Sequence, residues 1–297
     1  MHPRRQLLAL GGPGLIWLAL FVTVGLYALV SIAAGGLDPI LLTPVPAWSP
    51  LHWNFTVLGQ VTSSFNPFGG GDWHLFLRTC IYIAISLTAC ILIGYPVAYF
   101  TAVRARRTKG PLLVLLVIPL LVSYMLRMLA WVGLLSPGGW VNSVLLHLGI
   151  ISSQVNWLNG MSVTVVLGLI YGWIPYFILP LYASLARFDT RYLEAAADLG
   201  ASGTATFVRV TLPLSAQGIL AGSVIVALPM FGDYFTNGLL SGTSSTSMVG
   251  TLINSYAQSE SGQATSAAQA LLLIGFLTLL LLPYLRSSAR ANGVVVR

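Results

Sequence analysis

Charged side chains are scarce in this chain of 297 residues, in which Asp, Glu, Lys and Arg together make up only 7%. Soluble domains carry roughly 25% charged residues, so the composition excludes an ordinary water-soluble globular protein. The hydrophobic fraction is 56% and the mean hydropathy is +0.85. These values are typical of a protein that crosses a membrane several times.

Residues for metal binding, disulfide formation and nucleotide hydrolysis are also lacking. The two cysteines, Cys80 and Cys90, lie about 15 Å apart along one predicted helix, which is too far for a disulfide. The four histidines are scattered, so no metal site is predicted. Lys109 is the only lysine and belongs to no Gly-Lys-Ser/Thr phosphate loop. The sequence also has neither a Gly-x-Ser-x-Gly nor a His-Glu-x-x-His motif. We therefore expect no enzymatic activity and no cofactor in this chain.

Long apolar runs are what the sequence has instead. A helix crosses the hydrocarbon core with about 20 apolar residues, whereas the strands of a membrane barrel alternate polar and apolar positions. We predict an all-α helix bundle with six transmembrane helices, forming a single membrane domain over residues 1–297. The predicted spans lie at about 8–34, 76–103, 111–135, 161–186, 214–240 and 264–285.

The first span also has features of a secretory signal peptide. Arg4 and Arg5 precede an apolar run, and Ser31-Ile32-Ala33 has the small-x-small pattern of a cleavage site. The run is too long for an ordinary signal peptide and five more spans follow it. We therefore expect a retained membrane anchor.

Basic residues gather on one side of the predicted membrane. Loops 35–75, 136–160 and 241–263 contain no Lys or Arg, whereas 12 of the 14 basic residues lie at the termini and in the two other loops. By the positive-inside rule, both termini are cytoplasmic. The net charge of +7 follows from this topology and gives no reason to expect a nucleic-acid partner. The 12 residues are Arg4, Arg5, Arg104, Arg106, Arg107, Lys109, Arg187, Arg191, Arg209, Arg286, Arg290 and Arg297.

The cytoplasmic loop 187–213 is polar between two apolar spans. Residues 192–199 are good helix formers, and Asp189 or Thr190 can cap the start of that helix. Gly200 stands where a helix end favours a left-handed residue. We predict a short helix followed by a glycine turn.

The remainder of the loop predicts a second short helix and the entry into the fifth span. Ser202 can cap the second helix, which would run to Val208. Pro213 suits the first turn of the following span, where its missing N–H group has no helical partner to lose. From composition alone, an amphipathic helix lying on the bilayer surface is an equally good interpretation of this loop.

The spacing in this loop resembles the EAA motif of the permease subunits of bacterial ABC importers. The matching positions are Glu194-Ala195-Ala196, Gly200, Val210 and Leu212-Pro213, with Val210 where isoleucine is usual. The resemblance implies a fold like that of type I importer permeases and a helix that docks into a cleft of the ATPase subunit. It makes Glu194 the contact, Ala195 and Ala196 the close-packing face, and Gly200 the turn.

The resemblance also implies partners and a location. Such a permease works in the bacterial inner membrane with two ATP-binding cassette subunits, which bind ATP and Mg²⁺, and with an external solute-binding protein. One EAA loop supplies one coupling site, so a second permease subunit is expected, which we take to be a different chain. Membrane lipids surround the assembly. A secondary transporter working without an ATPase is an alternative, although such proteins more often show internal repeats and intramembrane acids.

Further segments are similar to the spermidine/putrescine permeases of this family. They are residues 94–100, residues 118–120 with Arg127 and Trp131, residues 227–235 and residues 238–242. Permeases for opines, phosphonates or ferric iron share these segments, so polyamines are the first expectation and not the only one. Substrate selection in such importers resides largely in the external binding protein.

Six residues are candidates for the substrate path. Arg127 lies about 24 Å into the third span and Asp233 about 30 Å beyond Pro213, if each span is one continuous helix. Asp233 could contribute to a cation path or outer gate, pair with Arg127, or stay wetted at the interface. The aromatic residues could contact a cation or serve as packing and interfacial anchors. They are Tyr124, Trp131, Trp173 and Tyr176.

Overall fold

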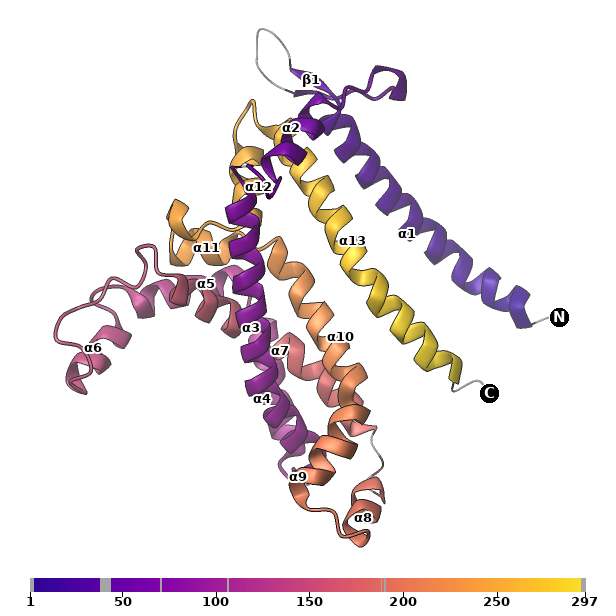
Figure 1. Ribbon diagram of the computed structural model, residues 1–297, viewed down its shortest axis with the longest axis vertical. Coiled ribbons are helices and arrows are strands. Elements are labelled where there is room, and N and C mark those ends of the chain that lie inside the picture. The colour runs from indigo at the N-terminus through magenta and orange to yellow at the C-terminus, as the bar shows by residue number, and fades with distance from the viewer. Residues whose placement is uncertain are drawn as a thin grey trace. The chain divides into compact units, whose positions relative to one another are not determined.

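The computed structural model describes residues 3–37, 44–69, 71–105, 107–187, 189 and 191–294, with side chains described between residues 11 and 286 (Figure 1). The chain divides into two compact units. The first consists of Met1–Trp73 with Leu252–Thr278, and the second of His74–Thr251 with Leu279–Arg297. Each unit is described by itself.

The first unit begins with a long apolar helix, α1 (Pro3–Ala33), followed by a small antiparallel pair of strands in which Gly36 lies opposite Val45. Its core is small: Ala33, Val61 and Ala268 are buried against one another, with Leu29 and Leu271 packed around them. The remaining elements are β1 (Gly36–Leu37), β2 (Pro44–Val45), η1 (Pro50–His52), α2 (Thr56–Ser64), most of α12 (Val249–Gln258) and the first half of α13 (Gln263–Val294).

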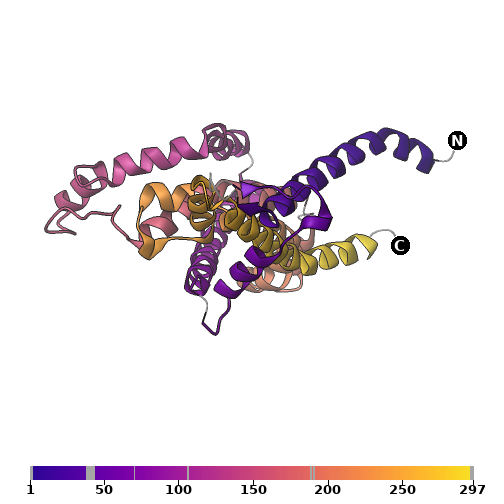
Figure 2. The ribbon, with the colours of Figure 1, turned by 90° about the horizontal axis from the view of Figure 1, so that it is seen from above.

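The second unit is built around α7, which packs most extensively against α10. Figures 1 and 2 show α11 lying beside α5, in agreement with the contacts between these helices. Besides the start of α12 and the second half of α13, the elements are α3 (Trp73–Tyr99), η2 (Phe100–Arg104), α4 (Lys109–Leu121), α5 (Tyr124–Leu135), α6 (Trp140–His147), α7 (Ser162–Ala186), α8 (Arg191–Asp198), α9 (Gly203–Thr206), η3 (Phe207–Thr211), α10 (Leu212–Phe231), α11 (Phe235–Leu240) and η4 (Ser244–Thr246).

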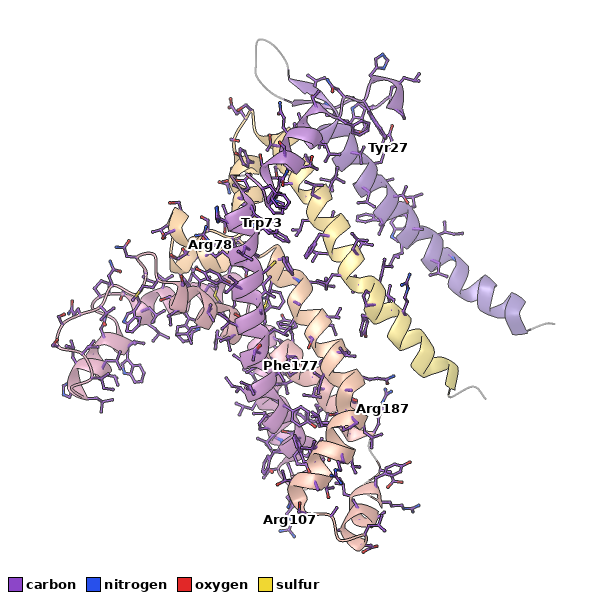
Figure 3. All side chains as sticks on the ribbon, viewed as in Figure 1. Tyr27, Trp73, Arg78, Arg107, Phe177 and Arg187 are labelled. Carbon is purple, nitrogen blue, oxygen red and sulfur yellow. The ribbon has the colours of Figure 1, made fainter. Side chains whose placement is uncertain are left out.

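Phe177 of α7 occupies the centre of the second unit and is fully buried (Figure 3). A Cβ atom on Gly94 of α3 would lie 2.8 Å from Cδ1 of its ring, and one on Gly222 of α10 would lie 2.9 Å from Cδ2. Membrane helices commonly use such small residues to bring their backbones together. The two glycines therefore let α3 and α10 close on either side of the same aromatic ring.

Six helical stretches in the described chain are long and apolar enough to cross a membrane, which confirms the predicted all-α architecture with six spans. The first, second, fourth and sixth agree with the predicted ranges to within a few residues. The six stretches are Gly11–Ala33, Trp73–Arg104, Tyr124–His147, Ser162–Ala186, Gly203–Phe231 and Gln263–Arg286.

The predicted third span at 111–135 is not one continuous helix. α4 ends at Leu121, Val122 and Ser123 have extended backbones with ψ of 131° and 139°, and α5 begins at Tyr124. Pro119 lacks the N–H group that would bond to the preceding turn and so weakens the end of α4. Ser123 then occupies the N-cap position, and its carbonyl accepts the Arg127 N–H at 3.1 Å. Residue counting from the start of the span therefore does not give the depth of Arg127.

The predicted fifth span at 214–240 also ends early. α10 stops at Phe231, and a turn at residues 232–234 leads into α11. The Asp233 carboxylate accepts the backbone N–H of Thr236 at 3.0 Å, an arrangement that starts a new helix. Asp233 consequently lies in an interhelical turn and not on a spanning helix. The helices α2, α6 and α12 all lie in segments that the sequence predicted to be loops.

Candidate functional site

The segment predicted to couple to an ATPase, loop 187–213, begins with α8, whose start is capped by the side chain of Asp189. Its carboxylate accepts the backbone N–H of Arg191 at 3.0 Å, and its carbonyl accepts that of Tyr192 at 3.2 Å. These bonds satisfy two amide groups that the first turn of a helix leaves without intrahelical partners. The other predicted cap, Thr190, lies outside the described residues.

The end of α8 is a left-handed glycine turn. Gly200 has φ of +77°, its N–H donates to the Ala197 carbonyl at 2.9 Å, and the Ala201 N–H donates to the Ala196 carbonyl at 3.0 Å. This pair of bonds is a Schellman motif, in which glycine is preferred because other residues are strained at positive φ. The predicted conformation of Gly200 is therefore confirmed.

The second half of the segment is a continuous helical rod and not a separate short helix. The Ser202 hydroxyl accepts the Ala205 N–H at 3.3 Å, which confirms its predicted role as a cap. From there α9, the π-helical turn η3 and α10 follow without a break to Phe231. Val210 lies in the π-helical turn, and Pro213 lies in the first turn of α10, as predicted.

α8 presents an exposed surface that combines a carboxylate with apolar side chains. Glu194 and Ala195 are exposed, whereas Ala196 is half-buried. Tyr192 and Leu199 are 59% and 88% exposed and lie on the same helix face as Ala195, because positions three or four apart align. Within the described chain, the most extensive contacts of α8 are with the start of the rod, at α9 and η3. Such a short amphipathic helix is accessible to another protein.

A second cluster centres on the carboxylate of Asp233, which is only 6% exposed. Its Oδ2 accepts the hydroxyl groups of Tyr124 at 2.5 Å and Thr236 at 2.6 Å, and its Oδ1 accepts the Thr236 N–H at 3.0 Å. Three donors of this chain therefore satisfy the carboxylate. The sequence did not single out Thr236, although an aspartate before a helix commonly accepts the backbone N–H of a residue in the first turn.

Arg127 lies next to this cluster and is 4% exposed. Its Nη1 donates to the Gly172 carbonyl at 3.1 Å, and its guanidinium carbon lies 5.4 Å from the centroid of the Tyr124 ring. Its Nε and Nη2 atoms are buried and have no hydrogen-bond partner among the described residues. Arg127 and Asp233 form no direct ion pair. Tyr124 connects them instead, with its ring on the cation and its hydroxyl on the anion.

The aromatic candidates divide into two groups. The ring centroids of Tyr124 and Trp173 lie 5.4 Å apart, and those of Trp173 and Tyr176 also lie 5.4 Å apart, so these three rings form one row. Trp131 instead packs against Tyr171 at 5.3 Å. The structure thus brings five of the six predicted path residues together and places Trp131 in a separate contact.

Gly172 makes this cluster possible and was missed by sequence reasoning. Its carbonyl accepts Arg127, and a Cβ atom at this position would lie 2.6 Å from Cε2 of Tyr124. Nothing in the local sequence distinguishes it from other glycines of membrane helices. Elsewhere in the described part of the chain, no three His, Cys, Asp or Glu side chains gather as a metal site would require.

Comparison with known proteins gives a consistent result. Residues 75–291 match the family model "Binding-protein-dependent transport system inner membrane component". The spermidine/putrescine transport system permease protein PotB of Escherichia coli (strain K12) is 34% identical over 223 residues, covering 75% of this chain and 80% of the relative. The corresponding protein of Haemophilus influenzae is 34% identical over 235 residues, covering 79% and 80%.

Solved structures share the fold at lower sequence identity. A bacterial ABC transporter that imports the acidic polysaccharide alginate matches with a TM-score of 0.59 and 13% identity, over 95% of this chain and 97% of the other. A bacterial alginate ABC transporter in complex with a pentasaccharide-bound periplasmic protein matches with a TM-score of 0.66 and 17% identity, over 94% of each chain. The chain is therefore a multi-pass inner-membrane protein that belongs to the family of binding-protein-dependent transport system inner membrane components, the permease subunits of ABC importers.

Proposed function

We propose that this chain forms half of the translocation pathway of an ATP-driven importer for polyamines such as spermidine and putrescine. The observation that carries the proposal is the 34% identity to spermidine/putrescine permeases over three quarters of the chain. Polyamines are flexible cations, and the row of Tyr124, Trp173 and Tyr176 offers aromatic faces of the kind that attract such groups.

In this proposal, α8 couples ATP hydrolysis in the ATPase subunit to the translocation pathway. The exposed face of α8 would seat in the ATPase subunit, with Glu194 contacting basic or polar groups there and Ala195 and Ala196 allowing a close approach. Gly200 sets the turn that fixes α8 against the rod, and Val210, Leu212 and Pro213 carry the rod into the membrane. The exposure of Glu194 supports this role.

The remaining components are separate chains. Two ATP-binding cassette subunits would bind ATP and Mg²⁺, a second and different permease would complete the pathway, and an external solute-binding protein would deliver the substrate. Both termini and α8 would face the cytoplasm, because basic residues are concentrated in those segments.

The buried charges favour a second candidate substrate class. Asp233 is already satisfied by three donors, whereas Arg127 has two unpaired nitrogen atoms. A guanidinium with free donors suits a carboxylate or phosphonate. An opine or phosphonate importer is therefore the alternative. Titration of the associated binding protein with spermidine and with an opine separates the two: binding of the opine alone would contradict the polyamine proposal.

Docking through α8 is tested by replacing Glu194 with Arg and Gly200 with Val in the complete complex. We expect loss of the ATPase subunits on purification and loss of uptake, because the contact and its turn are both changed. Glu260→Arg is the matched control, since Glu260 is an exposed glutamate outside α8. Normal assembly and uptake with both positions of the coupling segment changed would contradict the proposal.

A further inference from the structure

Two π-helical turns lie in the second unit, one at the end of α3 and one in the rod before α10. In η2 the Ala105 N–H donates to the Phe100 carbonyl, and in η3 the Leu212 N–H donates to the Phe207 carbonyl. Each bond spans five residues where an α-helix spans four. Such turns are rare and are frequent at functional positions.

Phe207, the first residue of η3, connects these two regions. Its ring meets the ring of Tyr95 edge-on with centroids 5.5 Å apart, and that of Tyr99 edge-on at 6.4 Å. Tyr95 and Tyr99 are the last-turn tyrosines of α3, immediately before η2. Edge-to-face aromatic pairs are directional, so a shift of Phe207 changes both contacts.

A hydrogen bond joins α3 to α10 next to the aromatic contacts of Phe207. The hydroxyl groups of Tyr95 and Ser215 lie 2.9 Å apart. Because the Ser215 hydroxyl donates to the Leu212 carbonyl at 3.0 Å, the Tyr95 hydroxyl is the donor in this bond. Tyr95 and Ser215 are 7% and 2% exposed. α3 is thus attached to η3 at its first residue, Phe207, and to α10 at Ser215, beyond the end of the π-helical turn.

α8 packs against the start of the same rod. It contacts α9 and η3, and the same chain continues from the Gly200 turn into the rod. Any displacement of α8 therefore moves residues 203–211 first. We propose that Phe207 is the positioning residue that transmits movement of α8 to α3, with η3 as the compliant element that lets the start of the rod move while Ser215 holds the rest. This inference rests on the proposed coupling role of α8.

The variant Phe207→Ala tests whether Phe207 transmits movement of α8 to α3. It is studied in the complete complex, reconstituted in vesicles with its ATPase, second permease and binding protein. The measured quantity is the amount of radiolabelled spermidine imported per ATP hydrolysed. We expect this ratio to fall on the order of tenfold, because two edge-to-face contacts are lost, while the ATPase still co-purifies through the unchanged α8.

The matched control is Val208→Ala, the next residue of the same turn, whose side chain is 52% exposed. It should leave the ratio unchanged. Phe207→Tyr keeps the ring and should restore coupling, whereas Phe207→Leu keeps the volume without the ring and should not. A purely structural role would lower the melting temperature and the yield of all inactive variants without changing the ratio in the protein that assembles. A ratio for Phe207→Ala equal to that of Val208→Ala would overturn the proposal.

Coupling through Phe207 and transport of polyamines can be distinguished by their outcomes. If the unaltered complex hydrolyses ATP but imports no spermidine, the polyamine proposal fails. The role of Phe207 is then tested by measuring how strongly the binding protein stimulates ATP hydrolysis. Phe207→Ala should abolish that stimulation. Stimulation equal to that of the unaltered complex would contradict the proposed role of Phe207. If the unaltered complex does not assemble with an ATPase, the proposed coupling through α8 is contradicted, and the proposed role of Phe207 is contradicted with it.

Discussion

At the scale of single residues, two opposite charges are buried in the second unit without touching. Arg127 and Asp233 are connected through Tyr124, whose ring and hydroxyl contact one charge each. Buried charges are costly unless neighbouring groups compensate them. Tyr124 thus allows both charges to remain in the structure while leaving part of Arg127 unpaired.

This arrangement predicts a non-additive pair of substitutions. Arg127→Gln and Asp233→Asn should each destabilise the protein by about 3 kcal/mol, because each leaves the opposite charge buried alone. The double variant should be less destabilised than the sum of the two by at least about 1 kcal/mol. Melting temperatures of the purified protein in detergent measure the effect. Strictly additive losses would show that the two charges do not interact.

A second residue-scale prediction concerns the close approach at Gly172. Gly172→Ala should cost about 1–3 kcal/mol, because its Cβ would lie 2.6 Å from a Tyr124 ring that Asp233 and Thr236 hold in place. Gly133→Ala in α5 is the matched control, since no atom lies within 4 Å of the added methyl group. Equal melting temperatures for the two variants would refute the steric argument.

The candidate site could be predicted in part. Ionisable and aromatic residues are conspicuous in apolar spans, so Arg127, Asp233, Tyr124 and Trp173 were found from the sequence. Thr236 and Gly172 were missed because their roles arise from contacts between helices far apart in the chain. Trp131 and Trp173 both lie in apolar stretches, and their tertiary contacts separate them.

At the scale of elements, the apolar pattern predicts where helices are and not where they break. Lipid and protein interior are both apolar, so the sequence around Val122 looks the same whether or not the helix continues. The end of α10 was equally hidden, since residues 232–234 are flanked by apolar side chains on both sides. The termini of α8 were predictable because capping depends on local chemistry at Asp189 and Gly200.

The glycine turn after α8 gives a prediction at this scale. Gly200→Ala should destabilise the turn by about 1 kcal/mol, because alanine is strained at φ of +77°. Amide hydrogen exchange in residues 192–201 should become several-fold faster. Gly203→Ala should not have this effect, since no atom lies within 4 Å of the added Cβ and its φ is not positive. Unchanged exchange in Gly200→Ala would show that the turn does not hold α8 in place.

At the scale of the whole molecule, the charge distribution predicts the orientation in the membrane. With Cys80 and Cys90 replaced by serine, a cysteine introduced at Ala197 should react with a membrane-impermeant maleimide only in inverted vesicles. A cysteine at Ser153 should react only from outside, because basic residues are absent from loop 136–160. Both positions are exposed in the structure. The reverse labelling pattern would contradict the proposed topology.

In the mechanism that we propose, ATP hydrolysis in a partner subunit drives uptake through this chain. The most direct measurement is uptake of radiolabelled spermidine into vesicles that contain this permease with its second permease and ATPase subunits, and with the loaded binding protein on the outer side. We expect uptake that requires ATP on the ATPase side and is lost when Glu194 and Gly200 are both replaced. Uptake by this chain alone, driven by an ion gradient and unaffected by ATP, would contradict it.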